Sequence, residues 1–259
     1  MPSSSERFMT YEYLLQTALT TEAVTRRELQ TERHLEALDV LLRFPSFCGG
    51  SSTPDDDWFP WWCSMQYCAV GHSTASLFDL WQRGFYVEAT VLLRHVLEVF
   101  IQVRYFHGHR SELRNHLTST ERKNRVRFKT MFELFAPGYY DQYYGLLLSG
   151  VAHGGLPSTT MRLDLSKGQQ ATAILGNAYN EKYATWVLNQ LTAVLFGLLK
   201  LFPEFFPQYP DLVDTESSQA RIASLQWLSQ VMSSHRQGQP RSASWYESIE
   251  KLVCWSGTE

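Results

Sequence analysis

Hydrophobic residues fill most positions from Gly84 to His109, in the stretch GFYVEATVLLRHVLEVFIQVRYFHGH. The spacing predicts a helix of about six turns that is too apolar to lie on the surface. At about 100° per residue, its polar side chains fall within an arc of about 120°. We therefore expect a central helix with a single polar face. That face comprises Glu88, Arg94, His95, Glu98 and Gln102, and the predicted core residues include Val91, Leu93, Val96, Leu97, Val99, Phe100 and Val103.

A second helix is predicted directly before the central one, from about Trp58 to Arg83. Asp57 can cap its first turn, and Gly84 stands where a helix C-cap is usual. Because the connection is so short, the two helices should pack as antiparallel neighbours. We expect their polar lines either to face each other or to face the same groove, with His72 within side-chain reach of Glu98. The polar line of the second helix comprises His72, Ser76, Asp79 and Arg83.

Helical patterns also account for most of the remaining chain, and they predict an all-α helical bundle with additional N- and C-terminal helices. Residues 1–57 should form an N-terminal helical segment and loop, residues 58–202 the core bundle, and residues 203–259 a C-terminal helical extension. A small hairpin or an ordered loop is expected in residues 159–175. The other predicted helices are 11–43, with a candidate break at Thr20–Glu22, and 111–135, 139–153, 179–202, 216–235 and 245–255.

Composition narrows the classes of function. The chain of 259 residues is 44% hydrophobic, and its net charge of −3 argues against broad electrostatic binding of nucleic acid. The four cysteines show no CxxC pair, which favours reduced thiols in a cytoplasmic protein. The N-terminus lacks the pattern of a signal peptide. Because polar residues interrupt the most apolar run, Trp186 to Phe202, no membrane span is expected.

The charge pattern predicts the environment of two further segments. His34 lies in the run TERHLE and is expected on a solvated face. The segment from Ser111 to Phe135 is the most basic part of the chain. It predicts either a solvated helix face or a surface for phosphate-bearing ligands.

Arg94 and Glu98 stand four residues apart on the central helix, between hydrophobic positions, so the pair should be partly buried. Burying two charges is costly unless their bonds compensate. The pair is therefore either a structural ion pair or part of a site. Ser149 and His153 lie one turn apart at the end of the predicted helix 139–153. We expect His153 to donate a ring N–H to Glu98, while Arg94 binds the other side of the carboxylate.

Familiar cofactor and metal motifs are missing from the sequence, including GxxxxGK[ST], GxGxxG, GxSxG and HExxH. No cofactor and no metal are expected. A metal enzyme built on His72, Glu98 and His153 ranks last among the alternatives, because histidine pairs at ligand spacing on a helix are missing.

The run EATVLLRHVLEVF, followed about fifty residues later by SGVAHGG, resembles a family of bacterial all-helical proteins of unknown function. That family is similar to the wider HEPN-like group, and the similarity covers about Trp62 to Leu201. The resemblance implies an up-and-down bundle of four or five helices, often dimeric. Some HEPN-like domains are metal-independent ribonucleases in toxin or antiphage defence systems and carry an Arg-x4-6-His motif. The matches here are Arg104-x4-His109 and Arg110-x5-His116.

These observations lead to two hypotheses of function. The first is a helical binding or interaction module that holds a nucleotide or another phosphate-bearing ligand around Arg94, Glu98 and His153, with His72, Ser76 and Ser149 as further ligand contacts. The alternative is a metal-independent ribonuclease toxin or defence protein, with His153 or His109 as base and Arg94 or Arg104 on the phosphate. The partners expected are RNA or a nucleotide, a second copy of the chain, and an antitoxin or another protein.

Overall fold

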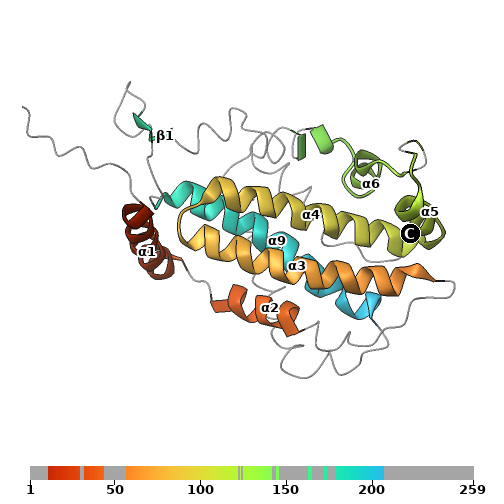
Figure 1. The fold of residues 1–259 in the computed structure, drawn as a ribbon, viewed down its shortest axis with the longest axis horizontal. Coiled ribbons are helices and arrows are strands. Elements are labelled where there is room, and N and C mark those ends of the chain that lie inside the picture. Colours follow the sequence, from red (N-terminus) through yellow and green to blue (C-terminus); the bar gives the residue numbers. More distant parts are fainter. Residues whose placement is uncertain are drawn as a thin grey trace, which may run out of the picture.

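The structure, a computed structural model, describes residues 11–29, 32–43, 57–121, 123, 125–141, 144–145, 163–164, 172–173 and 179–206. Across these residues the predicted all-α helical bundle is confirmed (Figure 1). Their strands form one short antiparallel pair, with Leu163 opposite Ala173, inside the predicted hairpin. The elements are α1 (Tyr11–Glu28), α2 (Glu32–Arg43), α3 (Trp58–Gln82), α4 (Tyr86–Gly108), α5 (Arg110–Thr118), α6 (Phe128–Phe135), β1 (Leu163–Asp164), β2 (Thr172–Ala173) and α9 (Glu181–Phe205).

Helices α3 and α4 form the antiparallel pair expected from the short connection between them (Figure 1). Asp57 caps α3, since its carboxylate accepts the backbone N–H of Phe59 at 3.0 Å. The chain reverses at Gly84, whose φ of +82° is a conformation that only glycine adopts without steric cost. The amide of Phe85 then donates to the carbonyl of Leu80 at 2.9 Å. Both helix ends therefore lie where the sequence placed them.

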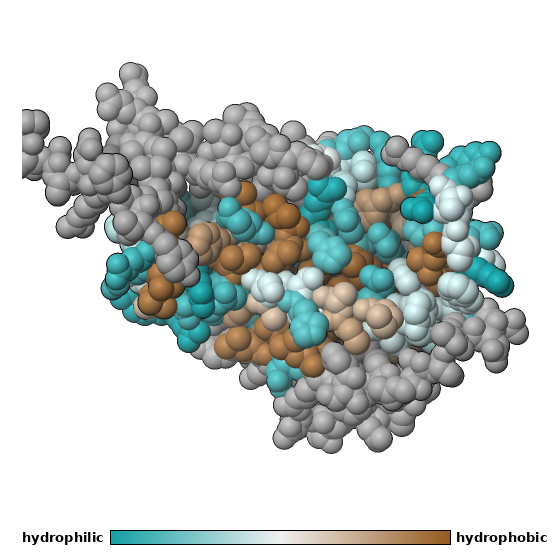
Figure 2. All heavy atoms as spheres, viewed as in Figure 1, coloured by the Kyte–Doolittle hydropathy of each residue, from teal (hydrophilic) through white to brown (hydrophobic). Residues whose placement is uncertain are grey.

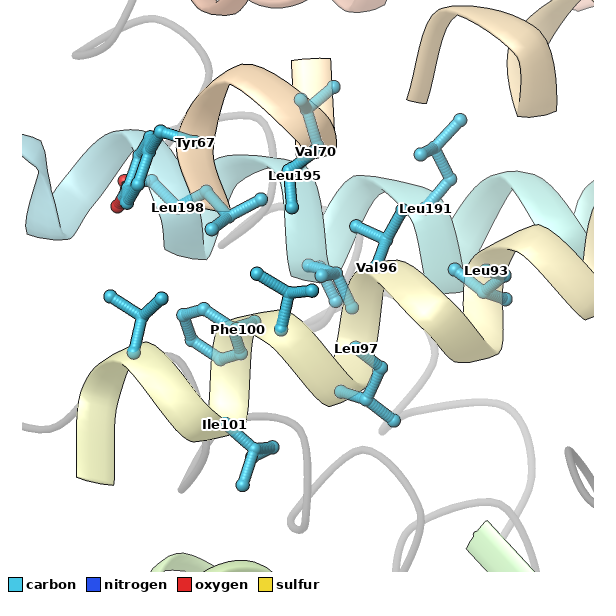
Figure 3. Close-up of a cluster of buried hydrophobic side chains, with 14 of the residues drawn as sticks. Tyr67, Val70, Leu93, Val96, Leu97, Phe100, Ile101, Leu191, Leu195 and Leu198 are labelled. Atoms are coloured by element: carbon cyan, nitrogen blue, oxygen red, sulfur yellow. The ribbon is translucent and has the colours of Figure 1, made fainter. Parts of the chain in front are cut away.

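Helix α9 packs against both α3 and α4 and completes the core. Two polar groups of α3 are buried against it, and each donates a hydrogen bond to its backbone. The Tyr67 hydroxyl donates to the Leu198 carbonyl at 2.9 Å, and the Trp81 indole N–H donates to the Ala184 carbonyl at 2.8 Å. The apolar contact between the helices includes Leu93, Val96, Phe100, Leu191, Leu195 and Leu198 (Figure 3).

Helix α2 packs in the bundle through Leu38, Leu41 and His34, and the last of these was expected on a solvated face. The side chain of His34 is fully buried, and its Nε2 lies 2.7 Å from the Thr192 hydroxyl of α9. The expectation of a solvated His34 was therefore wrong. Charged neighbours in the sequence suggested solvent, but the helix turns this one position toward the Phe78 ring, with the two ring centres 6.4 Å apart. Burial lowers the pKa of His34 to about 4.

Two helix boundaries and the exposure of one side chain differ from expectation. The break between α1 and α2 follows Glu28 and does not occur at Thr20–Glu22, where α1 continues. Helix α9 ends at Phe205, three residues beyond its predicted end. The side chain of Val91 is 41% exposed, because it shares the solvent-facing side of α4 with Glu88 and His95. The apolar periodicity predicts which side of α4 is buried, but it assigns too many positions to that side.

The exposed surface mixes apolar and polar groups. The face of the molecule in Figure 2 shows hydrophobic residues interspersed with hydrophilic ones. Exposed large hydrophobic residues include Met65 of α3 and Leu19 of α1. Within the described ranges, every helix is too short or too polar to cross a membrane.

Candidate functional site

Arg94 and Glu98 form the ion pair that their spacing on α4 predicted. The Arg94 Nε donates to the Glu98 Oε1 at 2.9 Å. The two side chains are 23% and 27% exposed, so the pair is partly buried, as expected. The pair lies at the boundary between core and solvent.

Tyr144 supplies the third member of this site. Its hydroxyl donates to the Glu98 Oε1 and accepts from the Arg94 Nε at 2.9 Å. The Arg94 guanidinium carbon also lies 5.1 Å from the centre of the Tyr144 ring, a cation–π contact. We refer to Arg94, Glu98 and Tyr144 as the Arg94 site. Each of the three contacts the other two, so each restricts the orientation of the others.

The electrostatics of the Arg94 site keep its groups in defined protonation states. Burial raises the pKa of Tyr144 well above its usual value, and its bond to Glu98 raises it further, while Arg94 lowers it. The tyrosine is therefore a neutral hydroxyl that can donate. Partial burial by itself would lower the pKa of Arg94, but its bonds to Tyr144 and Glu98 outweigh that effect and raise it. Arg94 is a permanent cation.

An aromatic cluster surrounds Tyr144. Its ring centre lies 4.7 Å from that of Phe128 and 5.1 Å from that of Tyr140, to which it is stacked at 26°. Phe132 of α6 completes the cluster, with its ring centre 5.7 Å from that of Tyr140 and 6.4 Å from that of Tyr144. Lys129 of α6 forms an ion pair with Asp141 at 2.8 Å. A second cation therefore stands beside the same rings.

The structure does not bring His72 into the Arg94 site. His72 and Ser76 lie on the exposed side of α3, as their polar line predicted. Between His72 and Glu98, both of which are described, no hydrogen bond or ion pair forms, because Glu98 bonds to Arg94 and Tyr144. The predicted approach of His72 to Glu98 therefore stays a prediction, while the Glu98 carboxylate bonds to residues of α4 and of the segment after α6. Ser149 and His153 lie outside the described residues, so their place in the site stays a prediction.

In each of the two Arg-x4-6-His matches, the arginine and the histidine contact different neighbours. Arg104 is 3% exposed, and its guanidinium carbon lies 4.1 Å from the centre of the Phe135 ring. His109 lies between α4 and α5, with its ring stacked on Tyr105 at 4.2 Å and its Nδ1 2.9 Å from the Tyr105 carbonyl. Both side chains of this match are therefore engaged in packing.

The arginine and the histidine of the second match also contact different residues. Arg110 pairs with Asp57 at 2.6 Å and lies over the Phe59 ring. His116 packs on the Phe106 ring, with centres 4.9 Å apart, and partial burial followed by the charge of Arg125 lowers its pKa.

The basic segment is not one continuous helix. It divides into α5 and α6, which are joined by residues 119–127. Arg114, Arg125 and Arg127 are exposed there, and the guanidinium of Arg125 donates twice to the Ser119 carbonyl, at 2.9 and 2.8 Å. These contacts agree with the solvated face that was one of the two expectations.

Sequence reasoning missed Tyr144, although a signal was present. Four tyrosines crowd the segment YYDQYY, and a tyrosine there packs against α4 only if the chain folds back after α6. In the described part of the chain, no cluster of three or more histidine, cysteine or acidic side chains is placed to hold a metal ion. Comparisons with protein-family models, with curated proteins and with solved structures found no match.

Proposed function

We propose that this protein is a helical binding module that holds a phosphate-bearing ligand at the Arg94 site. The observation that carries the proposal is the Arg94 guanidinium, which is charged, partly exposed and fixed by Glu98 and Tyr144. Arginine binds phosphate through charge-assisted, often bidentate hydrogen bonds. A guanidinium already held in place loses less conformational entropy when a ligand binds.

The neighbours of Arg94 support exchange of one anion for another. Glu98 already neutralises the guanidinium, so the cation is stable in the absence of a ligand. A phosphate carries more charge than a carboxylate and can compete for the same donors. When a phosphate displaces the Glu98 carboxylate, the one Tyr144 O–H that now donates to Glu98 is released to donate to a phosphate oxygen.

Several finer expectations from the sequence belong to the same proposal. The resemblance to HEPN-like proteins supports a homodimeric bundle that also binds a protein partner, and the cysteine pattern without a CxxC pair supports a cytoplasmic protein. A sedimentation-velocity measurement at several concentrations tests the dimer, since a dimer sediments faster than a monomer of the same chain.

Isothermal titration calorimetry with ribose 5-phosphate, in a buffer free of phosphate, tests the binding proposal. Arg94→Gln should weaken binding by at least about tenfold, because a charged hydrogen-bond donor is lost. Arg83→Gln is the matched control, since Arg83 forms an ion pair of the same spacing with Asp79 on α3. Equal affinity of the wild type and Arg94→Gln would contradict the proposal, as would the absence of binding.

The ribonuclease alternative has a direct test of its own. Arg104 is buried under Phe135, which disfavours it as a phosphate contact, and Arg94 is then the better choice for that role. The wild type, Arg94→Ala and His153→Ala should be incubated with RNA in the presence of EDTA. Cleavage by the wild type alone supports a metal-independent ribonuclease, and its absence in all three supports the binding module.

A further inference from the structure

Two ion pairs flank a pair of stacked tyrosine rings next to the Arg94 site. Tyr140 and Tyr144 are stacked with centres 5.1 Å apart, and we call them the tyrosine stack. The Arg94 guanidinium lies 5.1 Å from the Tyr144 ring centre, and the Lys129 ammonium lies 5.1 Å from the Tyr140 ring centre. Each cation is neutralised by its own carboxylate, Glu98 for Arg94 and Asp141 for Lys129. Cations and flat aromatic surface therefore alternate within one small region.

Tyr140 is electrostatically linked to both ion pairs. Partial burial is the main reason that its pKa is raised. The charges of Lys129 and Arg94 act in the opposite direction, while Asp141 and Glu98 raise the pKa further. The Tyr140 side chain is thus near enough to feel the charges of both cations and both carboxylates. Tyr140 also stacks on Tyr144, whose ring contacts the Arg94 guanidinium, so a ligand on Tyr140 lies next to a direct neighbour of Arg94.

We propose that the ligand of the Arg94 site is a nucleoside phosphate, with its base stacked on Tyr140 and its phosphate bound by Arg94. This inference rests on the proposed function, and it selects one class among phosphate-bearing ligands. A sugar phosphate or inorganic phosphate would use Arg94 but leave the tyrosine ring unused. A base has the flat π-surface that stacks on an aromatic side chain, and such stacking tolerates any base.

The position of Lys129 allows a base to replace it over the Tyr140 ring. Its side chain is 52% exposed, and the bonds that hold it go to Asp141, which is 77% exposed. An exposed ion pair of this kind contributes little to stability, so a base can displace the lysine from the Tyr140 ring at low cost. The displaced ammonium remains available to a second phosphate oxygen.

Calorimetry on the full chain tests this inference with AMP, adenosine and ribose 5-phosphate as probes, in a buffer free of phosphate. AMP should bind about tenfold more tightly than ribose 5-phosphate, which is the gain expected from stacking one base. Adenosine should bind more weakly than AMP because it lacks the phosphate. Tyr140→Leu should bring the affinity for AMP down to that for ribose 5-phosphate. Tyr179→Leu, which alters a partly exposed tyrosine just before α9, should change neither.

The outcomes separate this inference from the proposed function. Equal affinities of the wild type for AMP and ribose 5-phosphate contradict the proposal of a nucleoside phosphate ligand. They do not contradict the proposal that Arg94 binds phosphate. Binding of neither probe overturns both. A preference for AMP that persists in Tyr140→Leu also overturns the inference, since the base then stacks elsewhere. Should Tyr140→Leu fail to fold, the comparison of AMP with ribose 5-phosphate in the wild type still decides.

Discussion

At the scale of single residues, the Arg94 site is held by charges that are neither fully solvated nor fully buried. An exposed ion pair contributes at most about 1 kcal/mol to stability, whereas removal of one partner from a buried pair costs about 3–5 kcal/mol. Arg94 and Glu98, at 23% and 27% exposed, lie between these limits. Glu98 is the central acceptor, because both Arg94 and Tyr144 donate to the same oxygen.

Glu98→Ala should therefore lower the free energy of unfolding by about 1–3 kcal/mol, because Arg94 and the Tyr144 hydroxyl both lose their acceptor. Urea denaturation at neutral pH measures this change. Asp79→Ala is the control, since Asp79 pairs with Arg83 on the exposed side of α3 and its loss should cost less than about 0.5 kcal/mol. A Glu98→Ala variant that is as stable as the wild type and binds ribose 5-phosphate with unchanged affinity would show that Glu98 has neither a structural nor a ligand-binding role in the Arg94 site.

At the scale of elements, the contact between α2 and α3 depends on a glycine. A Cβ atom at Gly71 would lie 3.2 Å from the carbonyl oxygen of Leu41, a backbone atom that cannot rotate away. The next nearest atoms are the carbonyl carbon of Leu41, at 3.6 Å, and the Leu42 Cδ2, at 3.7 Å. Glycine is costly inside a helix, by about 1 kcal/mol relative to alanine. Its presence in α3 is explained by this close approach of α2.

Gly71→Ala should be nearly neutral in stability, since the gain in helix propensity offsets a shift of α2 by a few tenths of an ångström. Gly71→Val should lower the free energy of unfolding by about 1–3 kcal/mol, because its branches collide with the Leu41 backbone. Gly108→Ala is the matched control, as a Cβ there would meet no atom within 4 Å. Thermal denaturation of the three variants ranks them. A Gly71→Val variant that melts with the wild type would show that α2 does not pack so closely.

At the scale of the whole molecule, His34 joins two parts of the chain that are 158 residues apart. It extends from α2 to the Thr192 hydroxyl of α9, which in turn donates to the Leu188 carbonyl at 2.6 Å. The threonine proton is thereby committed to that carbonyl, so His34 donates from Nε2. A buried, uncharged imidazole of this kind makes the attachment of α2 to the bundle sensitive to pH.

The sign of that dependence follows from the two pKa values of His34. In the unfolded chain the imidazole titrates near 6.5, whereas burial lowers the pKa of the folded state to about 4. Below pH 6.5 the unfolded state therefore binds a proton that the folded state does not. Stability contributed by neutral His34 is complete above pH 6.5 and is lost as the pH falls toward 4, by about 2–3 kcal/mol at pH 4.5.

Urea denaturation of the wild type and His34→Gln at pH 7.5 and pH 4.5 measures this contribution. The wild type should lose about 2–3 kcal/mol more than the variant between the two values, because glutamine does not titrate. Carboxylates affect both proteins alike and cancel in the difference. The same loss in both proteins would contradict a buried, neutral His34.

Local patterns were sufficient to predict the elements that depend on the chain nearest to them. The helical period, the Asp57 cap and the Gly84 turn together predicted α3, α4 and their antiparallel pairing, and all three are confirmed. The spacing of Arg94 and Glu98 predicted their ion pair for the same reason, since residues one helical turn apart meet wherever the helix lies. The sequence by itself determined these features.

Only the tertiary structure decided which distant residues join them. Tyr144 lies 46 residues beyond Glu98, and Thr192 lies 158 residues beyond His34, so no local spacing could have selected either partner. The contacts arise from the direction in which the chain returns after α6 and from the packing of α9 across α2. A helical period fixes which residues share a face of one helix. Which other helix covers that face is decided by the packing of the whole core, and this is why His34 is buried and His72 remains in solvent.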